Sequence, residues 1–318
     1  MARRKKGNPV HGWLILDKPF EMTSTTAVAI VKRLLDAQKA GHAGTLDPLA
    51  TGILPIALGE ATKTVSFAVD GEKAYRFTVR WGAQTTTDDT EGAITESSDA
   101  RPTLPEIEAK LPQFIGEIEQ VPPQFSAIKI DGNRAYDLAR EGETVALEAR
   151  TVIIDRLAVV DMPDDSTTVF EAECGKGTYV RAIARDLGRK LGCFGHVVAL
   201  RRTRVGPFSE ANAVTLAEVE QRMRPSNSDP DAPYPDPFEA RLLLPVEAAL
   251  SEIAEIAVSP SDAATLARGQ SVLIRGRDAP IYSGTAYAIC KGRIVAIGEI
   301  AQGALQPTRV FNMGMAPR

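Results

Sequence analysis

The 318-residue sequence has only three cysteines, Cys174, Cys193 and Cys290, an odd number placed far apart. Disulfide frameworks of secreted proteins use even sets of cysteines, and structural zinc sites use closely spaced pairs. The sequence therefore argues against both a disulfide scaffold and a zinc cluster. Three free thiols suit the reducing environment of the cytoplasm.

A long apolar run is also missing. No stretch approaches the roughly 18 consecutive apolar residues that a membrane-spanning helix needs. The first residues, Arg3-Arg4-Lys5-Lys6, are basic, but the apolar segment and cleavage site of a signal peptide do not follow them. We therefore expect neither a membrane segment nor a secretory signal.

The sequence has no excess of positive charge, since its formal net charge is -4. Phosphate binding depends on where the positive charges lie rather than on their sum. Lys and Arg gather at residues 3–6 and 176–204, whereas acids gather at 88–91, 161–165 and 229–231. This segregation predicts a basic groove on an acidic body. Arginines on a solvated helix face would give the same pattern.

The chain length favours two domains. We expect an α+β domain over residues 1–250, with a flexible proline-rich insertion at about 224–237, and a small β-rich module over 251–318. The module should contain one helix at 262–268 and four or five short strands. In the first domain, apolar patterns predict strands at 13–19, 73–81, 152–160, 167–174 and 196–205, and helices at 24–38, 103–111, 136–142, 178–191 and 216–223.

The most unusual stretch is residues 41–52, which read Gly-His-Ala-Gly-Thr-Leu-Asp-Pro-Leu-Ala-Thr-Gly. Three glycines and Pro48 surround one acid, Asp47, so the backbone can turn tightly on either side of it. Asp47 could simply cap a turn, as Asp before Pro often does. It could equally hold a negative charge in a fixed place on a stiffened loop, as a catalytic site requires.

This stretch resembles the catalytic loop of the TruB family of tRNA pseudouridine synthases, whose signature reads G-H-x-G-T-L-D-P-x-A-x-G. Four further blocks resemble the same family in the same order, at residues 13–19, 121–142, 176–181 and 200–208. The resemblance implies an α+β catalytic domain built on a mixed, mainly antiparallel sheet with a central cleft. It also implies that the C-terminal module is a PUA-like RNA-binding domain.

The resemblance implies the isomerisation of uridine 55 to pseudouridine in the TΨC arm of tRNA. The C1′–N1 bond breaks, the uracil turns, and C1′ joins C5, so no cofactor or metal is required. The expected partner is tRNA, with no membrane and no protein partner, for a monomeric cytoplasmic enzyme. A guide-RNA-dependent synthase and a chaperone that remodels the T arm without catalysis are the alternatives, and the absence of long basic tails argues against the former.

The resemblance also implies roles for single residues. Asp47 matches the catalytic aspartate, which could attack C1′, add to the base or remove the 2′-proton. Arg181 matches the arginine that pairs with it, and Tyr75 the tyrosine that packs on a flipped-out base. Without the resemblance, Arg181 would be interpreted as a phosphate contact or a surface residue, and Tyr75 as core.

His42 matches the histidine that takes the place of the flipped base in the RNA stack, and Tyr179 and Leu200 match further pocket positions. We also expect RNA contacts from four basic residues: Lys18, Lys63, Arg201 and Arg202. Residues 59–64 look superficially like a phosphate-binding P-loop but lack its glycines, so Lys63 should lie on a helix instead. Phe125 departs from the family pattern, in which tyrosine is frequent.

Overall fold

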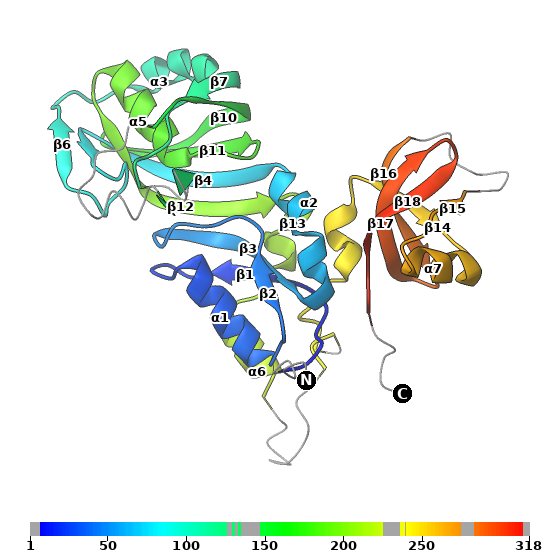
Figure 1. The fold of residues 1–318 in the computed structure, drawn as a ribbon. Helices are drawn as coiled ribbons and strands as arrows, with labels where there is room; N and C mark the ends of the chain where they lie inside the picture. The colour runs from blue at the N-terminus through cyan, green and yellow to red at the C-terminus, as the bar shows by residue number, and fades with distance from the viewer. Residues whose placement is uncertain are drawn as a thin grey trace.

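A computed structural model describes residues 7–125, 129–130, 133–134, 147–224, 236–238, 240–274 and 283–313. These residues form a long sheet with helices packed near both ends, and a smaller β-rich module lies beside it (Figure 1). The predicted α+β class is therefore confirmed. Within the same ranges, every helix is too short or too polar to cross a bilayer.

The long sheet places the start of β3 beside β12. Its strand order is β1 (Gly12–Lys18), β3 (Ala50–Leu58), β12 (Gly195–Val205), β4 (Lys73–Trp81), β11 (Thr167–Cys174), β10 (Arg150–Asp164) and β7 (Gly116–Gln120), with β2 (Ala40–His42) on β3 and β13 (Phe208–Ser209) on β12. The β3–β12 pair is parallel and the other pairs are antiparallel. The parallel register sets Ala50 beside Leu200 and Gly52 beside Arg202. Segments about 150 residues apart thus meet just after Asp47.

Strand β4 shows why the sequence pattern works. Phe77, Val79 and Trp81 are buried on one face, while Arg76 and Arg80 are exposed on the other. Alternation of this kind is typical of a strand with one covered face. The strand predicted at 73–81 is confirmed.

Four helices of the first domain lie close to predicted positions, whereas the one at residues 65–70 was not predicted. The helices are α1 (Ser24–Leu34), α2 (Val65–Asp70), α3 (Leu104–Lys110), α5 (Val180–Leu191) and α6 (Leu216–Arg222), with 3-10 turns η1 (Gly59–Lys63), η2 (Leu111–Phe114), η3 (Glu210–Asn212) and η4 (Val246–Leu250). The residue type of Ser24 and its place before an apolar stripe predict it as the N-cap of α1, but the structure has Thr23 there. Ser24 is buried and its hydroxyl bonds elsewhere.

Two segments with a weak hydrophobic pattern form small two-stranded sheets. Strands β5 (Ala83–Thr85) and β6 (Ile94–Ser97) form a hairpin in a segment that the sequence marked only as polar and turn-rich. Strands β8 (Lys129–Ile130) and β9 (Asn133–Arg134) pair with each other. The helix predicted at 136–142 and most of the proline-rich insertion lie outside the described residues.

The C-terminal module has the predicted helix, α7 (Pro260–Ala267), and a sheet in the order β14 (Ala254–Ala257), β16 (Gly284–Cys290), β17 (Arg293–Ala301), β18 (Ala304–Val310) and β15 (Val272–Leu273). One buried apolar cluster contains Trp13 and Phe208 from the catalytic part and Ile297 and Phe311 from the module. Burial of such a cluster favours one docked arrangement. We propose a domain boundary near residue 251.

Polar contacts add to this docking. Lys63 Nζ donates to the Val310 carbonyl at 2.7 Å and to Glu60 Oε2 at 2.6 Å. The same Glu60 oxygen accepts from the Asn312 backbone at 2.8 Å. These hydrogen bonds hold the end of β18 against η1.

Candidate active site

The backbone of the loop at residues 43–49, here called the Asp47 loop, is hydrogen-bonded almost continuously. Arg202 donates to the Gly44 carbonyl at 3.0 Å, to the Thr45 carbonyl at 3.4 Å and to the Ile53 carbonyl at 2.8 Å. The Asp47 carbonyl accepts from the Ala50 amide at 3.1 Å. Satisfying so many carbonyls holds a turn-rich segment in one conformation.

The β1–α1 connection binds the same loop from another side. Lys18 Nζ donates to the Pro48 carbonyl at 3.2 Å, and also to the carbonyls of Pro19 and Met22 at 2.9 and 2.7 Å. The Glu21 amide donates to the Pro48 carbonyl at 3.0 Å. Lys18 and Glu21 thus act as a second support for the Asp47 loop.

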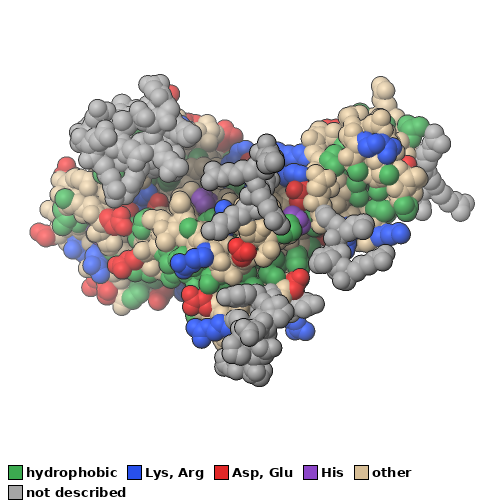
Figure 2. Space-filling model, turned by 60° about the horizontal axis from the view of Figure 1, so that its bottom comes forward, with side chains coloured by type: hydrophobic (Ala, Val, Ile, Leu, Met, Phe, Trp, Pro, Cys, Tyr) green, Lys and Arg blue, Asp and Glu red, His purple; other side chains and the backbone are tan. Residues whose placement is uncertain are grey.

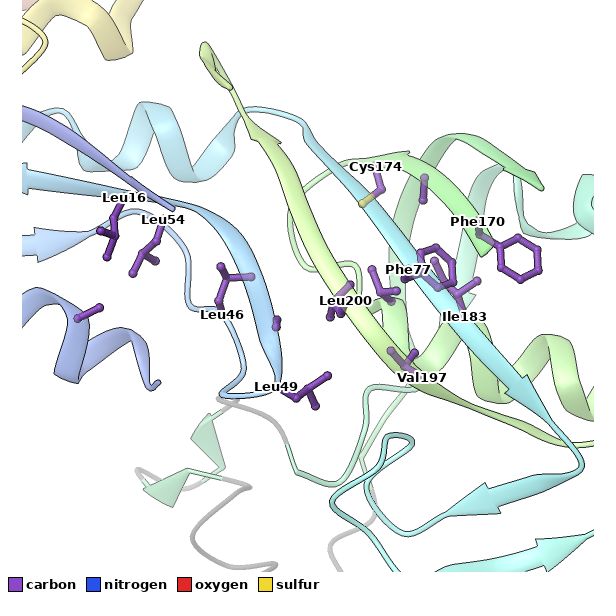
Figure 3. Close-up of a cluster of buried hydrophobic side chains, with 14 of the residues drawn as sticks. Leu16, Leu46, Leu49, Leu54, Phe77, Phe170, Cys174, Ile183, Val197 and Leu200 are labelled. Carbon is purple, nitrogen blue, oxygen red and sulfur yellow. The ribbon is translucent and has the colours of Figure 1, made fainter. Parts of the chain in front are cut away.

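Side chains of the loop fasten it to the core as well. Leu46 and Leu49 flank Asp47 and lie in one buried apolar cluster with Leu200 (Figure 3). Glycine is required at Gly52, where φ is +96° and an added Cβ would lie 2.2 Å from the Arg202 carbonyl. The loop therefore presents Asp47 from a rigid base.

The Asp47 carboxylate meets Arg181, the second residue of α5. Asp47 Oδ2 lies 2.9 Å from Arg181 Nη2, the Asp47 side chain is 36% exposed and the Arg181 side chain is 4% exposed. The pairing is made through the Nη atoms of Arg181, whereas its buried Nε has no hydrogen-bond partner among the described residues. Arg181 also donates to the carbonyls of Thr87 and Phe125, at 2.8 and 2.9 Å.

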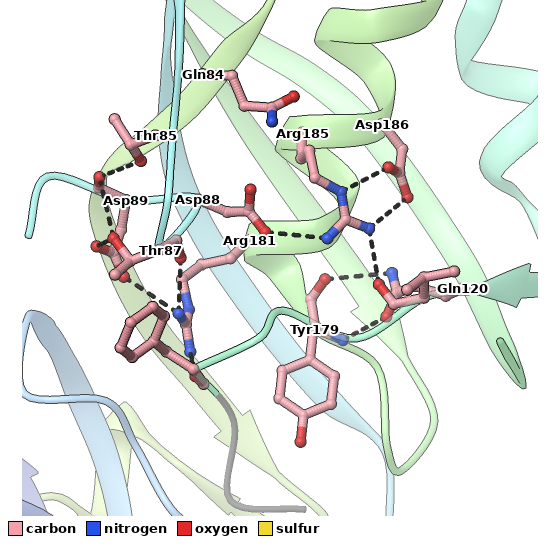
Figure 4. Close-up of polar contacts among 12 residues, drawn as sticks. Gln84, Thr85, Thr87, Asp88, Asp89, Gln120, Tyr179, Arg181, Arg185 and Asp186 are labelled. Carbon is pink, nitrogen blue, oxygen red and sulfur yellow. Dashed lines mark hydrogen bonds and ion pairs between the residues drawn. The ribbon is translucent and has the colours of Figure 1, made fainter. Parts of the chain in front are cut away.

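Two acids of the polar segment 83–97 complete this network (Figure 4). Asp89 Oδ2 lies 3.3 Å from Arg181 Nη1, and the Asp89 side chain is 2% exposed. One helical turn further along α5, Arg185 pairs with Asp88 at 3.0 Å. Burial raises the pKa of the Asp88 carboxyl to about 6, although Arg185 opposes the shift. Sequence patterning had placed these acids apart from the basic helix.

Gln120, at the end of β7, holds the start of α5. Its amide oxygen accepts from the Tyr179 amide at 2.8 Å, and its amide nitrogen donates to the Tyr179 carbonyl at 3.2 Å. Tyr179 is the N-cap residue of α5, and its ring points away from Gln120 and Arg185 (Figure 4). Gln120 therefore fixes the residue two positions before Arg181, and sequence reasoning missed it.

Tyr75 lies opposite Arg202 in the β4–β12 register. Burial raises the pKa of the Tyr75 hydroxyl, and the neighbouring Arg202 guanidinium opposes the shift while Asp47 adds to it. Tyr75 thus lies beside Arg202, and it packs against the main apolar cluster. His42, the last residue of β2, is half-buried beside Ile56 in the β2–β3 register.

All four basic residues predicted to contact RNA have partners within the protein. Arg202 is 2% exposed and Lys18 is 0% exposed, and both bond to backbone carbonyls around Asp47. Lys63 joins η1 to Val310. Carbonyls enclose Arg202 and Lys18 and leave little of either charge for a phosphate, whereas the Lys63 side chain is 31% exposed. RNA contact by these three residues stays a prediction.

Arg201 points to the opposite side of β12 from Arg202, as alternation on a strand requires. It pairs with Asp17 at 2.9 Å and with Glu210 at 2.6 Å, and its side chain is half-buried. Other Lys and Arg side chains gather where the catalytic part meets the C-terminal module (Figure 2). In the described part of the chain, no group of three or more His, Cys, Asp or Glu could hold a metal ion.

Comparison with known proteins gives independent evidence on the family of the chain. Residues 32–180 match the model of the TruB family pseudouridylate synthase N-terminal domain, and residues 181–251 match that of the tRNA pseudouridylate synthase B C-terminal domain. The chain is 56% identical to a tRNA pseudouridine synthase B of Bradyrhizobium diazoefficiens, covering 98% of this chain and 91% of the relative. It is 54% identical to that of Brucella anthropi, covering 99% and 100%.

Solved structures agree with the fold. A Cbf5–Nop10–Gar1 complex contains a chain with a TM-score of 0.72 and 25% identity, covering 95% of this chain and 84% of that one. An H/ACA ribonucleoprotein bound to a substrate RNA containing 2′-deoxyuridine gives a TM-score of 0.72 at 23% identity, covering 98% and 92%.

Proposed function

Because the chain belongs to the TruB family of pseudouridylate synthases, we propose that it converts uridine 55 in the T arm of tRNA to pseudouridine. The enzyme is an isomerase. In the reaction the C1′–N1 bond breaks, the C1′–C5 bond forms, C5 loses its proton and N1 gains one. All atoms are conserved, so the reaction balances without an added reagent.

The observation that carries the proposal is the pairing of Asp47 with Arg181 on a braced loop. The carboxylate lies 2.9 Å from the guanidinium and remains 36% exposed, so one side of it is open to a substrate. Cleavage of an N-glycosidic bond develops positive charge at C1′, and a carboxylate next to that carbon stabilises it or bonds to it. Arg181 provides the counter-charge before the sugar arrives.

The target uridine must leave the RNA stack to reach this acid. We propose that the ring of Tyr75 packs on the extruded base, because it lies beside Arg202, which binds the Asp47 loop, and an aromatic face favours stacking with any base. Leu200 and Tyr179 would line the pocket, and His42 would fill the space that the base leaves. The basic side chains near the C-terminal module would contact phosphates.

We further propose that the enzyme acts alone, as a cytoplasmic monomer. The relatives at 53–57% identity carry the name tRNA pseudouridine synthase B, whereas the Cbf5 chain of the Nop10 and Gar1 complex is only 25% identical. Activity of the purified protein on an unmodified tRNA transcript, without guide RNA, is the expected result. Loss of all activity without a guide RNA would support the guide-dependent alternative.

The decisive experiment maps modified uridines in tRNA after incubation with the wild-type protein and with Asp47→Asn. We expect a single pseudouridine at position 55 with wild type and none with the variant. The variant should keep tRNA binding within about tenfold, or about 1.4 kcal/mol, because only a charge inside the pocket is lost. Modification at another site, or an active Asp47→Asn protein, would refute the assignment.

A further inference from the structure

Ser24 holds both backbone groups of the residue that precedes Asp47. Its Oγ accepts a hydrogen bond from the Leu46 amide at 2.9 Å and donates one to the Leu46 carbonyl at 3.0 Å. Ser24 is 2% exposed and Leu46 is 4% exposed. In the part of the chain that the structure describes, Ser24 is the hydrogen-bond partner of both Leu46 backbone groups, and no second partner is present.

These two bonds act directly on the position of Asp47. The Leu46 carbonyl belongs to the peptide plane that ends at the Asp47 nitrogen, and a peptide plane rotates as one unit. Fixing the carbonyl therefore fixes the direction in which the chain enters Asp47. The side chain of Leu46 is anchored in the apolar core, so the plane is held at two points.

The far side of Asp47 is held by different donors. The Pro48 carbonyl accepts from Lys18 Nζ and from the Glu21 amide. These donors secure the peptide plane after Pro48, and none of them reaches Leu46. Ser24 is thus the part of the support that sets the incoming plane.

Helix capping does not explain the Ser24 hydroxyl. The N-cap of α1 is Thr23, whose Oγ1 accepts from the Thr26 amide at 3.0 Å. Ser24 is already inside the helix, and its hydroxyl points to the Asp47 loop instead. The two neighbouring hydroxyls therefore serve different purposes, which makes Thr23 a matched control.

We propose that Ser24 is a positioning residue for Asp47, which aligns the catalytic carboxylate with the sugar through the Leu46 peptide. The inference rests on the proposed role of Asp47. Removal of the hydroxyl leaves two buried backbone groups without partners, so the plane can rotate to find others. A displacement of about 1 Å at the reacting atom can cost a rate factor of about 100.

The test compares Ser24→Ala, Ser24→Cys and Thr23→Ala in single-turnover reactions at saturating tRNA, together with tRNA binding and thermal unfolding. We expect Ser24→Ala to lower the rate by about 10- to 100-fold while the Kd for tRNA stays within about threefold. Ser24→Cys keeps the buried volume, but a thiol is a weak donor and acceptor, so its rate should fall between that of Ser24→Ala and a value about threefold below wild type. Thr23→Ala should lower the Tm with a rate within about twofold of wild type.

Two results would overturn the proposal. One is a folded Ser24→Ala or Ser24→Cys protein that reacts within about twofold of wild type. The other is a Thr23→Ala protein that loses as much rate as Ser24→Ala, since that would assign the effect to helix α1 as a whole. An inactive wild-type protein would instead contradict the proposed function, so the two failures are distinguishable.

Discussion

Asp89 lies 3.3 Å from Arg181, so the arginine that pairs with Asp47 is itself bound by a second, buried carboxylate. The partly exposed Asp47 and the buried Asp89 both pair with the Arg181 guanidinium. Asp89 in turn accepts from the Thr87 hydroxyl and from the Glu91 amide. The position of Arg181 is therefore set from the β5–β6 segment, on the side that substrate does not reach.

The first prediction concerns this buried acid. Asp89→Asn removes the charge that holds Arg181, so we expect at least a tenfold lower single-turnover rate and unchanged tRNA binding. Stability should fall by about 2–3 kcal/mol, because Arg181 keeps Asp47 as a partner and is not fully orphaned. Asp88→Asn, which affects Arg185 instead, is the control. Equal rate losses in both variants would point to a general disturbance of α5.

The second prediction concerns Asp88 and the pH dependence of stability. Its folded-state pKa of about 6 lies above the ordinary 3.8, so the folded protein binds the extra proton more tightly than the unfolded chain does. The stability from this group is complete below the unfolded pKa and is lost as pH rises through about 6. Urea unfolding at pH 4.5 and 7 should show that Asp88→Asn loses less stability than wild type over this interval. Parallel changes in the two proteins would disprove it.

The third prediction concerns Lys18, whose pKa burial lowers from 10.5 to about 8 while Asp47 opposes the shift. Above about pH 8 the side chain keeps two donors for three carbonyls, so the Asp47 loop loses a hydrogen bond and the rate should decline. The rate should fall at alkaline pH, but the contribution of Lys18 to folding stability should rise. Its pKa is lower in the folded protein than in the unfolded chain, so stability increases between pH 8 and pH 10.5. A pH–rate profile of Lys18→Met should lack the alkaline decline. The same decline in both proteins would assign it to another group.

The fourth prediction concerns Glu21, which has φ +59° and is exposed. A left-handed conformation costs a residue with a Cβ roughly 1 kcal/mol, and glycine avoids that cost. Because the Glu21 amide must donate to Pro48, the conformation is required. We expect Glu21→Gly to raise the Tm with unchanged activity, whereas Glu21→Val should lower it. A less stable glycine variant would contradict this account.

Much of the fold could be predicted because its pattern is local. The alternation in β4 and the apolar stripe of α5 each lie within one short segment, and the structure has both. The Asp47 loop was identified by its glycines and proline. The approach of Arg181 to Asp47 was expected from the family resemblance, and the distance of 2.9 Å is consistent with it.

The pairing partners were harder to predict because they depend on strand order. Asp88 and Asp89 lie in a polar segment that composition favours as solvated, yet the sheet brings them against α5. Arg202 was expected to contact RNA, but the parallel β3–β12 pair encloses it beneath the Asp47 loop. A one-residue difference along the same strand separates it from the half-buried Arg201. Such burial follows from long-range register, which no single segment encodes.

The hydrogen-bonded contact between η1 and the end of β18 has a consequence for substrate selection. Lys63 and Glu60 tie the C-terminal module to the strand that leads directly out of the Asp47 loop, and apolar side chains seal the same junction. A tRNA that contacts both the C-terminal module and the Asp47 loop therefore meets two surfaces whose separation is fixed before it binds. We expect the module to select for the length of the T arm. A T arm that is one base pair longer or shorter would place its uridine beyond Asp47 or short of it.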